Sequence, residues 1–166
     1  MLEQKHLALL DEAQRRGQPG TGTMRLCFEL LSLASGIDRA CAGRLAPHRL
    51  SEGKFVLLFL LRDLPDGLAP HELADRAGVT RATVTGLLDG LERDGFLARS
   101  RDHQDRRQVT VRLTAQGQAL AAELFQEHSQ WIAGLFSGLS ESEREVLSGL
   151  LQRVWRNLAP TEGDRR

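Results

Sequence analysis

The segment from residue 70 to residue 113 constrains the fold of this 166-residue chain more than any other part of the sequence. Pro70 suits the first position of a helix, and Gly78 suits the position just past its end, which makes that helix about two turns long. Thr80 can cap a second helix that reaches Asp94, with Gly95 as its stop. A short helix, a turn of about four residues and a second helix together predict a helix-turn-helix.

A β-hairpin is predicted directly after these helices. Residues 96–99 are expected to form a short strand. Residues 107–113 alternate polar and apolar side chains, which places Val109, Val111 and Leu113 on one half-buried face. The polar stretch 100–106 would then be the tip of the hairpin, or wing.

The remaining elements are predicted to be helices. They are expected at 2–16, at 23–45 after a linker at 17–22, from the N-cap Ser51 onward, after the cap Thr114, and after a capping box at Ser140 and Glu143. Because no alternation of strands and helices appears, the fold class is mostly α with a small β-hairpin wing. We expect a winged helix-turn-helix with N- and C-terminal dimerisation helices.

The chain is predicted to consist of five parts. They are an N-terminal extension helix and linker (1–22), a dimerisation helix (23–50), the winged helix-turn-helix DNA-binding domain (51–114), C-terminal dimerisation helices (115–159) and a tail (160–166). The last two helices carry apolar stripes that include Trp131 and Trp155. A small winged domain could not cover these stripes alone, so we interpret them as a core shared by two subunits of a homodimer.

The amino-acid composition limits the possible cellular location and partners of the protein. There is no apolar run of the roughly 18 residues that a membrane span needs, and no signal peptide, so we expect a cytoplasmic protein with no membrane partner. Two cysteines do not indicate a disulfide framework. The net charge is zero, but residues 99–112 hold five arginines against two aspartates, a local charge of +3. Such a local basic segment fits one element that touches phosphate.

Two sets of residues are candidates for contact with double-stranded DNA. In the helix-turn-helix, Leu73, Ala74 and Val79 are expected in the core, which leaves small polar and basic groups at the exposed start of the second helix: Thr80, Arg81, Thr83 and Thr85. The alternative is that these residues simply cap and solvate an ordinary helix.

The wing supplies the second set, which comprises Arg101, Asp105, Arg106 and Arg107. A narrow minor groove concentrates negative potential and attracts arginine. We expect Asp105 to orient an arginine while Arg107 enters that groove. A solvated charged turn is the competing interpretation.

The sequence resembles the multiple antibiotic resistance regulator (MarR) family. The resemblance lies in HELA at 71–74, VTRATVT at 79–85, LERDGFL at 91–97, DHQDRR at 102–107, VTVRLT at 109–114 and Gly117. It implies an obligate dimer that reads a pseudo-palindromic operator, commonly as a repressor released by a small ligand or by cysteine oxidation. Gly86 departs from the family pattern, because many relatives carry a larger polar residue there.

The family resemblance implies a small apolar or aromatic effector in the crevice between the dimer helices and the winged lobe. Candidate ligand-binding residues by position are Phe28, Leu31, His48, Phe55 and Phe59, each of which could equally be ordinary core.

Cys27 suggests a different effector. Its surroundings are similar to those of the peroxide-sensing cysteine of organic hydroperoxide resistance regulators, a MarR subgroup. That subgroup positions its cysteine with tyrosines, and this chain has none. Two roles for Cys27 therefore remain as alternatives: a redox-sensing thiol, or a buried structural cysteine. Cys41 lies roughly 21 Å further along a continuous helix, too far for an intrachain disulfide.

Other functions find little support. The five histidines show no metal-ligand spacing, no cofactor is indicated, and there is no motif for a catalytic nucleophile, a phosphate-binding loop or a metal hydrolase. We therefore expect no enzyme activity. A protein-interaction module that uses a winged fold without DNA remains an alternative.

Overall fold

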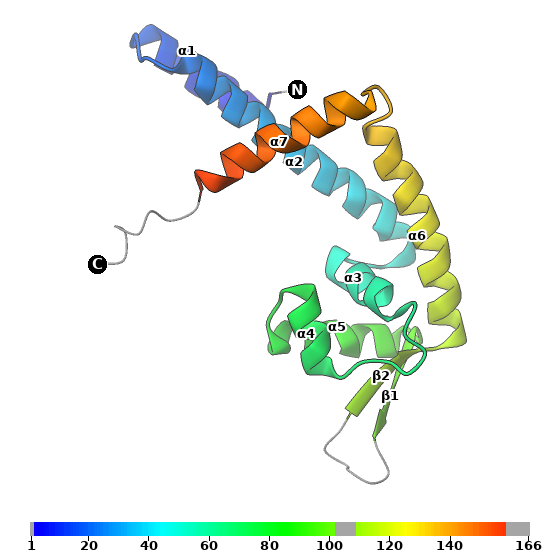
Figure 1. Cartoon of the computed structure of the whole chain (residues 1–166). Coiled ribbons are helices and arrows are strands. Elements are labelled where there is room, and N and C mark those ends of the chain that lie inside the picture. The colour runs from blue at the N-terminus through cyan, green and yellow to red at the C-terminus, as the bar shows by residue number, and fades with distance from the viewer. Residues whose placement is uncertain (1, 102–108, 159–166) are drawn as a thin grey trace. The chain divides into compact units, whose positions relative to one another are not determined.

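The structure, a computed structural model, describes residues 2–101 and 109–158 (Figure 1). The chain divides into two compact units, residues 1–118 and residues 119–166. The first contains α1 (Gln4–Arg15), α2 (Thr21–Leu45), the 3-10 turn η1 (Ala46–His48), α3 (Glu52–Leu61), α4 (Pro70–Ala77), α5 (Arg81–Arg93), β1 (Leu97–Arg101), β2 (Val109–Leu113) and the start of α6 (Ala115–Leu135). The second contains the rest of α6 and α7 (Glu141–Arg156). The mostly α fold with one hairpin wing is thus confirmed for the described residues.

Four helices begin where local side-chain signals predict. Ser51 accepts a hydrogen bond from the Lys54 N–H at 3.4 Å, and Thr80 accepts one from the Thr83 N–H at 3.1 Å. Thr114 Oγ1 accepts from the Gly117 N–H at 3.1 Å. At Ser140 the capping box is complete. Each cap satisfies an amide that the helix itself leaves unpaired.

The N-terminal extension is a helical hairpin of α1 on α2. Nδ1 of His6 and Oγ of Ser32 share a buried hydrogen bond at 3.1 Å, and the His6 ring stacks on Phe28 with centroids 4.6 Å apart. The predicted linker is shorter than expected, since α2 begins at Thr21 rather than at residue 23. Gly20, at φ 81°, makes the turn, so that the next two residues are already helical.

The core of the winged lobe is formed by α3, α4, α5 and β2. Its members are almost completely buried aliphatic side chains: Leu57, Leu58, Leu61, Leu73, Val84, Leu88, Leu91 and Val111. Burial of each such side chain stabilises the folded state by about 1.5–3 kcal/mol. This core fixes α5 by one face and leaves its opposite face to solvent.

Val79 corrects one expectation, because it does not lie in the core but is 40% exposed. Its N–H donates to the carbonyl of Ala74 at 3.1 Å, which closes the turn after α4. The interior behind the turn is already filled by Leu73 and Val84, both fully buried. The turn residue is therefore held by its backbone and not by its side chain.

The hairpin is longer than predicted on its first strand. β1 pairs antiparallel with β2 in the register Leu97↔Leu113 to Arg101↔Val109, so residues 100 and 101 belong to the strand and not to the tip. Leu68 adds a backbone bridge to Val111 on the other side of β2. That close approach requires Gly67, since a Cβ there would overlap the Val111 carbonyl oxygen.

Helix α7 buries none of its residues within the single chain. Except for the half-buried Leu147, its large apolar side chains are instead exposed to solvent. Together with Leu158 just after the helix, they comprise Val146, Leu150, Leu151, Val154, Trp155 and Leu158. Trp155 alone is 74% exposed. An apolar stripe of this extent on one helix indicates a surface that is covered in the functional assembly.

In the described parts of the chain, every helix is too short or too polar to span a lipid bilayer.

Candidate nucleic-acid interface

The backbone between α4 and α5 determines how the start of α5 is presented. Gly78 lies in the left-handed region at φ 65°, and its N–H returns to the carbonyls of the last turn of α4. The Glu72 carboxylate accepts the Ala69 N–H at 2.8 Å, which fixes the start of α4. Helix α5 then buries Val84 against this pair and exposes the side chains on its outer N-terminal face.

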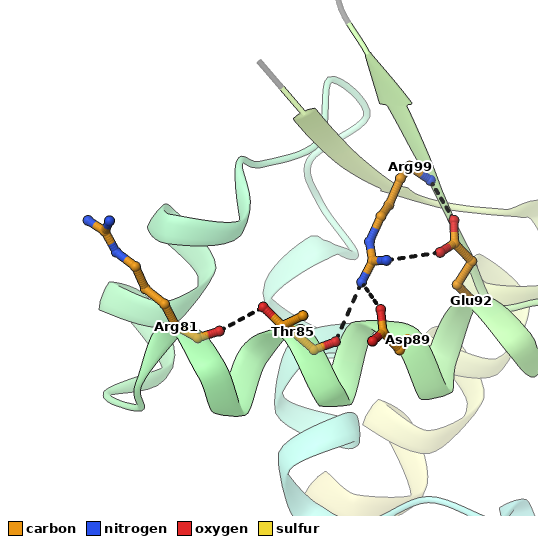
Figure 2. Close-up of polar contacts among 5 residues, drawn as sticks. All are labelled: Arg81, Thr85, Asp89, Glu92 and Arg99. Atoms are coloured by element: carbon orange, nitrogen blue, oxygen red, sulfur yellow. Dashed lines mark hydrogen bonds and ion pairs between the residues drawn. The ribbon is translucent and has the colours of Figure 1, made fainter. Parts of the chain in front are cut away.

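All four candidate residues at the start of α5, including its N-cap Thr80, are exposed, as predicted: Thr80, Arg81, Thr83 and Thr85. The Thr80 and Thr83 hydroxyl oxygens lie 2.8 Å apart, and the Thr85 hydroxyl donates to the Arg81 carbonyl at 2.9 Å. These hydrogen bonds hold the hydroxyls in fixed positions before any partner arrives. The Arg81 guanidinium extends away from the acidic residues further along α5 (Figure 2).

The C-terminal end of α5 is attached to α3. Lys54 Nζ donates to Asp94 Oδ2 at 2.7 Å, and this hydrogen bond holds the pKa of the Asp94 carboxyl below its usual range. The Lys54 stem lies across Gly90, where a Cβ would come within 2.7 Å of its Cε. Gly90 therefore allows Lys54 to reach Asp94.

Sequence reasoning missed Arg99, which joins β1 to α5 (Figure 2). Its Nη2 lies 2.6 Å from Asp89 Oδ1 and 3.5 Å from the Thr85 carbonyl oxygen. Its Nη1 lies 3.2 Å from Glu92 Oε2, and its backbone N–H donates to Glu92 Oε1 at 3.3 Å. The only available sequence signal was a pair of acids three apart on a helix, followed by a basic strand residue.

A groove lies between α5, the start of α4 and the first residues of β2. It has a volume of about 690 Å³, and its lining includes Arg81 and Thr85 from α5, His71 and Glu72 from α4, and Val109 and Thr110 from β2. The structure thus brings two of the four candidates, Arg81 and Thr85, onto one surface with the start of β2.

The wing tip is the part of the predicted site that the structure does not describe. Arg101 is the last residue of β1. Asp105, Arg106 and Arg107 lie outside the described residues, and their roles stay predictions.

The five candidate ligand residues come from three elements. Phe28 lies on α2, where it lines a small pocket with α1 residues such as Leu9 and Ala13. Leu31 is exposed further along α2, and His48 belongs to η1. Phe55 and Phe59 lie on α3, with the Arg62 guanidinium 5.4 Å from the centroid of the Phe59 ring. Their grouping around one ligand stays a prediction.

The two cysteines lie on one continuous helix, α2, as predicted. Cys27 is exposed, so within a single chain it is not the buried structural cysteine of the alternative interpretation. Cys41 is partly buried, and this burial raises the pKa of its thiol. In the described ranges, no cluster of three or more His, Cys, Asp or Glu side chains could hold a metal ion.

A short helix, a tight turn, a second helix with a solvent-exposed start and an antiparallel hairpin define a winged helix-turn-helix protein. The model of the MarR family matches residues 50–109. The transcriptional repressor YetL of Bacillus subtilis (strain 168) is 33% identical over 163 residues, which cover 95% of this chain and 98% of YetL. The chain belongs to the MarR family of transcriptional regulators, and it is accordingly a regulator and not an enzyme.

Solved structures agree with this assignment. The crystal structure of Streptococcus pneumoniae FabT in complex with DNA has a TM-score of 0.69 and 27% identity, and the match covers 82% of this chain and 96% of FabT. The PcaV regulator from Streptomyces coelicolor, in complex with its natural ligand, has a TM-score of 0.61 and 25% identity, with 77% of this chain and 92% of PcaV covered.

Proposed function

We propose that this protein is a homodimeric repressor that binds a pseudo-palindromic operator in double-stranded DNA. The observation that carries the proposal is the division of α5: its inner face is buried in the core, while Arg81, Thr83 and Thr85 are exposed at its start. This is the end of a recognition helix that meets base edges in the major groove. FabT, whose solved structure contains DNA, has the same fold.

Arginine and threonine have different roles at this tip. The Arg81 guanidinium can donate two hydrogen bonds to guanine or one to a phosphate. The Thr85 hydroxyl already donates to the Arg81 carbonyl, so toward DNA it offers an acceptor oxygen. Thr80 and Thr83 share one hydrogen bond and can direct the remaining hydroxyl proton to a phosphate.

The wing supplies the second contact in this proposal. Arg101, Arg106 and Arg107 reach the minor groove, with Asp105 orienting an arginine while Arg107 enters the groove. Support comes from Val109 and Thr110, at the end of β2 next to the tip, which line the same groove as Arg81.

Dimerisation supports the two-fold symmetry of such an operator. The exposed stripe on α7, from Val146 to Trp155, would be covered by the partner subunit. Symmetric pairing of identical surfaces is the commonest form of soluble assembly. Two copies of α5 would then read two half-sites about one helical turn apart.

A small apolar or aromatic ligand is the proposed effector, with Phe28, Leu31, His48, Phe55 and Phe59 as candidates. YetL is named a repressor, and PcaV was solved with its natural ligand. Peroxide sensing by Cys27 is the second candidate, favoured by the exposure of that thiol. The cytoplasmic location expected for such a regulator stays a prediction.

The decisive experiment is a titration of the full chain against the DNA upstream of its own coding sequence, at several salt concentrations. A regulator binds this DNA at least about 10³-fold more tightly than unrelated DNA, and its affinity falls steeply with salt. Equal, weak binding to both DNAs would instead favour the protein-interaction module.

A further inference from the structure

Three groups of α5 lie on one face of that helix and meet the side chain of Arg99. Thr85, Asp89 and Glu92 are spaced four and three residues apart, which places them in one row. Arg99 approaches this row from β1, and its two terminal nitrogens contact different carboxylates, at 2.6 Å for Asp89 and 3.2 Å for Glu92. One guanidinium thus forms ion pairs with two carboxylates (Figure 2).

We propose that Arg99 is a positioning residue for DNA binding, which acts by neutralising Asp89 and Glu92. The inference rests on the proposed DNA-binding function and adds to it a residue that need not touch DNA. Without Arg99, the face of α5 that carries Arg81 and Thr85 would also carry two carboxylates, Asp89 and Glu92, with no neutralising cation among the described residues.

The charges are placed so that this compensation matters. The side chains of Asp89 and Glu92 are 52% and 41% exposed, and they follow the DNA-reading tip of the same helix by one to two turns. Duplex DNA carries one negative charge per about 1.7 Å of its axis, so exposed carboxylates close to it are repelled. Arg99 is only 27% exposed, which places its charge between the acids and not out toward a phosphate.

The contact also attaches the first strand of the hairpin to α5. Arg99 pairs with Val111 in the hairpin, two residues before the end of β1 at Arg101. Its backbone N–H is held by the Glu92 carboxylate, so the strand and the helix are joined through main chain and side chain together. The end of β1 at Arg101 lies about 7 Å beyond this attachment, at the rise of a β-strand.

The test measures DNA affinity by fluorescence anisotropy for the full-length protein, with its own upstream DNA, in five variants. These are Arg99→Gln, Asp89→Asn with Glu92→Gln, the triple combination of all three changes, Arg112→Gln, and Arg112→Gln combined with the two acid changes. Arg112 is the matched control, because it lies on the partner strand of the same hairpin and donates to the Asp66 carbonyl at 2.9 Å, not to the acids. Circular dichroism and the sedimentation of each variant verify its fold and assembly.

We expect Arg99→Gln to weaken binding about tenfold or more at low salt, and the triple variant to regain most of that loss. When Asp89→Asn and Glu92→Gln are combined with Arg112→Gln, the DNA affinity should not rise by a comparable factor relative to Arg112→Gln alone. A triple variant that binds as weakly as Arg99→Gln would overturn the proposal, since a purely mechanical link is not repaired by removing charge. Wild-type affinity in a folded Arg99→Gln variant would overturn it too. If the wild-type protein itself binds no DNA, the proposed function fails, and the inference fails with it.

Discussion

Nζ of Lys54 lies 2.7 Å from Oδ2 of Asp94, so that the first turn of α3 is joined to the residue that follows α5. Both side chains are less than one third exposed, at 19% and 32%. The pair holds the C-terminal end of α5 against the core, while the N-terminal end of α5 is exposed. The stabilisation by this ion pair should therefore depend on whether the Asp94 carboxylate is charged.

This pair predicts a specific dependence of stability on pH. Because the Lys54 hydrogen bond lowers the pKa of Asp94 in the folded state, the stabilisation is present above the unfolded value of about 3.9 and is lost as the pH falls through the folded value. Asp94→Asn should lower the thermal midpoint at pH 7, and its difference from wild type should shrink toward pH 2. Asp75→Asn, at an exposed position on α4, is the control. A difference that is constant with pH would contradict the assignment.

Gly117 predicts a large loss of stability on adding a single methyl group. A Cβ at this position of α6 would overlap the backbone carbonyl of Phe96, which cannot move aside as a flexible side chain could. We expect Gly117→Ala to reduce the free energy of unfolding by about 2 kcal/mol or more. Gly86→Ala is the matched change, because no atom lies within 4 Å of its Cβ position on α5. It should be neutral or stabilise by up to about 1 kcal/mol. Urea titration of both variants checks this, and equal effects would contradict it.

DNA affinity should depend on one arginine of the helix and one of the wing. Arg81→Ala and Arg107→Ala are each expected to weaken operator binding at least about tenfold, or about 1.4 kcal/mol, without unfolding the protein. Arg15→Ala removes the same charge from the exposed surface of α1 and should leave the affinity almost unchanged. Unaltered binding by a folded Arg107→Ala variant would remove the wing from the mechanism.

The stripe on α7 predicts how the dimer can be broken. Leu150→Glu combined with Val154→Glu places two charges on the exposed apolar face, and burial of unpaired charges in an interface is costly. We expect the double variant to sediment as a monomer or to remain unfolded. Gln152→Glu, on the polar side of the same helix, should sediment as the wild type does. A double variant that is still dimeric would place the interface elsewhere.

The peroxide alternative depends on one sulfur atom. If the exposed Cys27 thiol is the switch, an organic hydroperoxide should release the wild-type protein from DNA, and Cys27→Ser should stay bound. Cys41→Ser should respond as the wild type does, because its thiol is partly buried and has a raised pKa. Release of the Cys27→Ser variant by peroxide would end this interpretation.

Local signals predicted the parts of this fold that are governed by local hydrogen bonds. Ser51, Thr80, Thr114 and Ser140 each bond to an amide three residues later, so the sequence contains both partners within one turn. Val79 was assigned wrongly because its burial depends on whether Leu73 and Val84 leave space, which spacing does not reveal.

Contacts between distant elements were not predictable in this way. Arg99 meets Asp89 and Glu92 only because β1 folds back along α5. His6 finds Ser32 across 26 residues for the same kind of reason. The sequence indicated the types of groups that such contacts need, but their pairing is decided by packing.

The junction between α5 and α6 has a consequence for the spacing of an operator. Thr114 donates to the Gly95 carbonyl at 2.7 Å and accepts the Gly117 N–H, while its own N–H is held by Phe96. The C-terminal end of α5 and the first turn of α6 are therefore joined by three hydrogen bonds of Thr114. In the proposed dimer, a change in the separation of the two half-sites calls for substitutions after residue 118, because substitutions at this junction would also loosen α5.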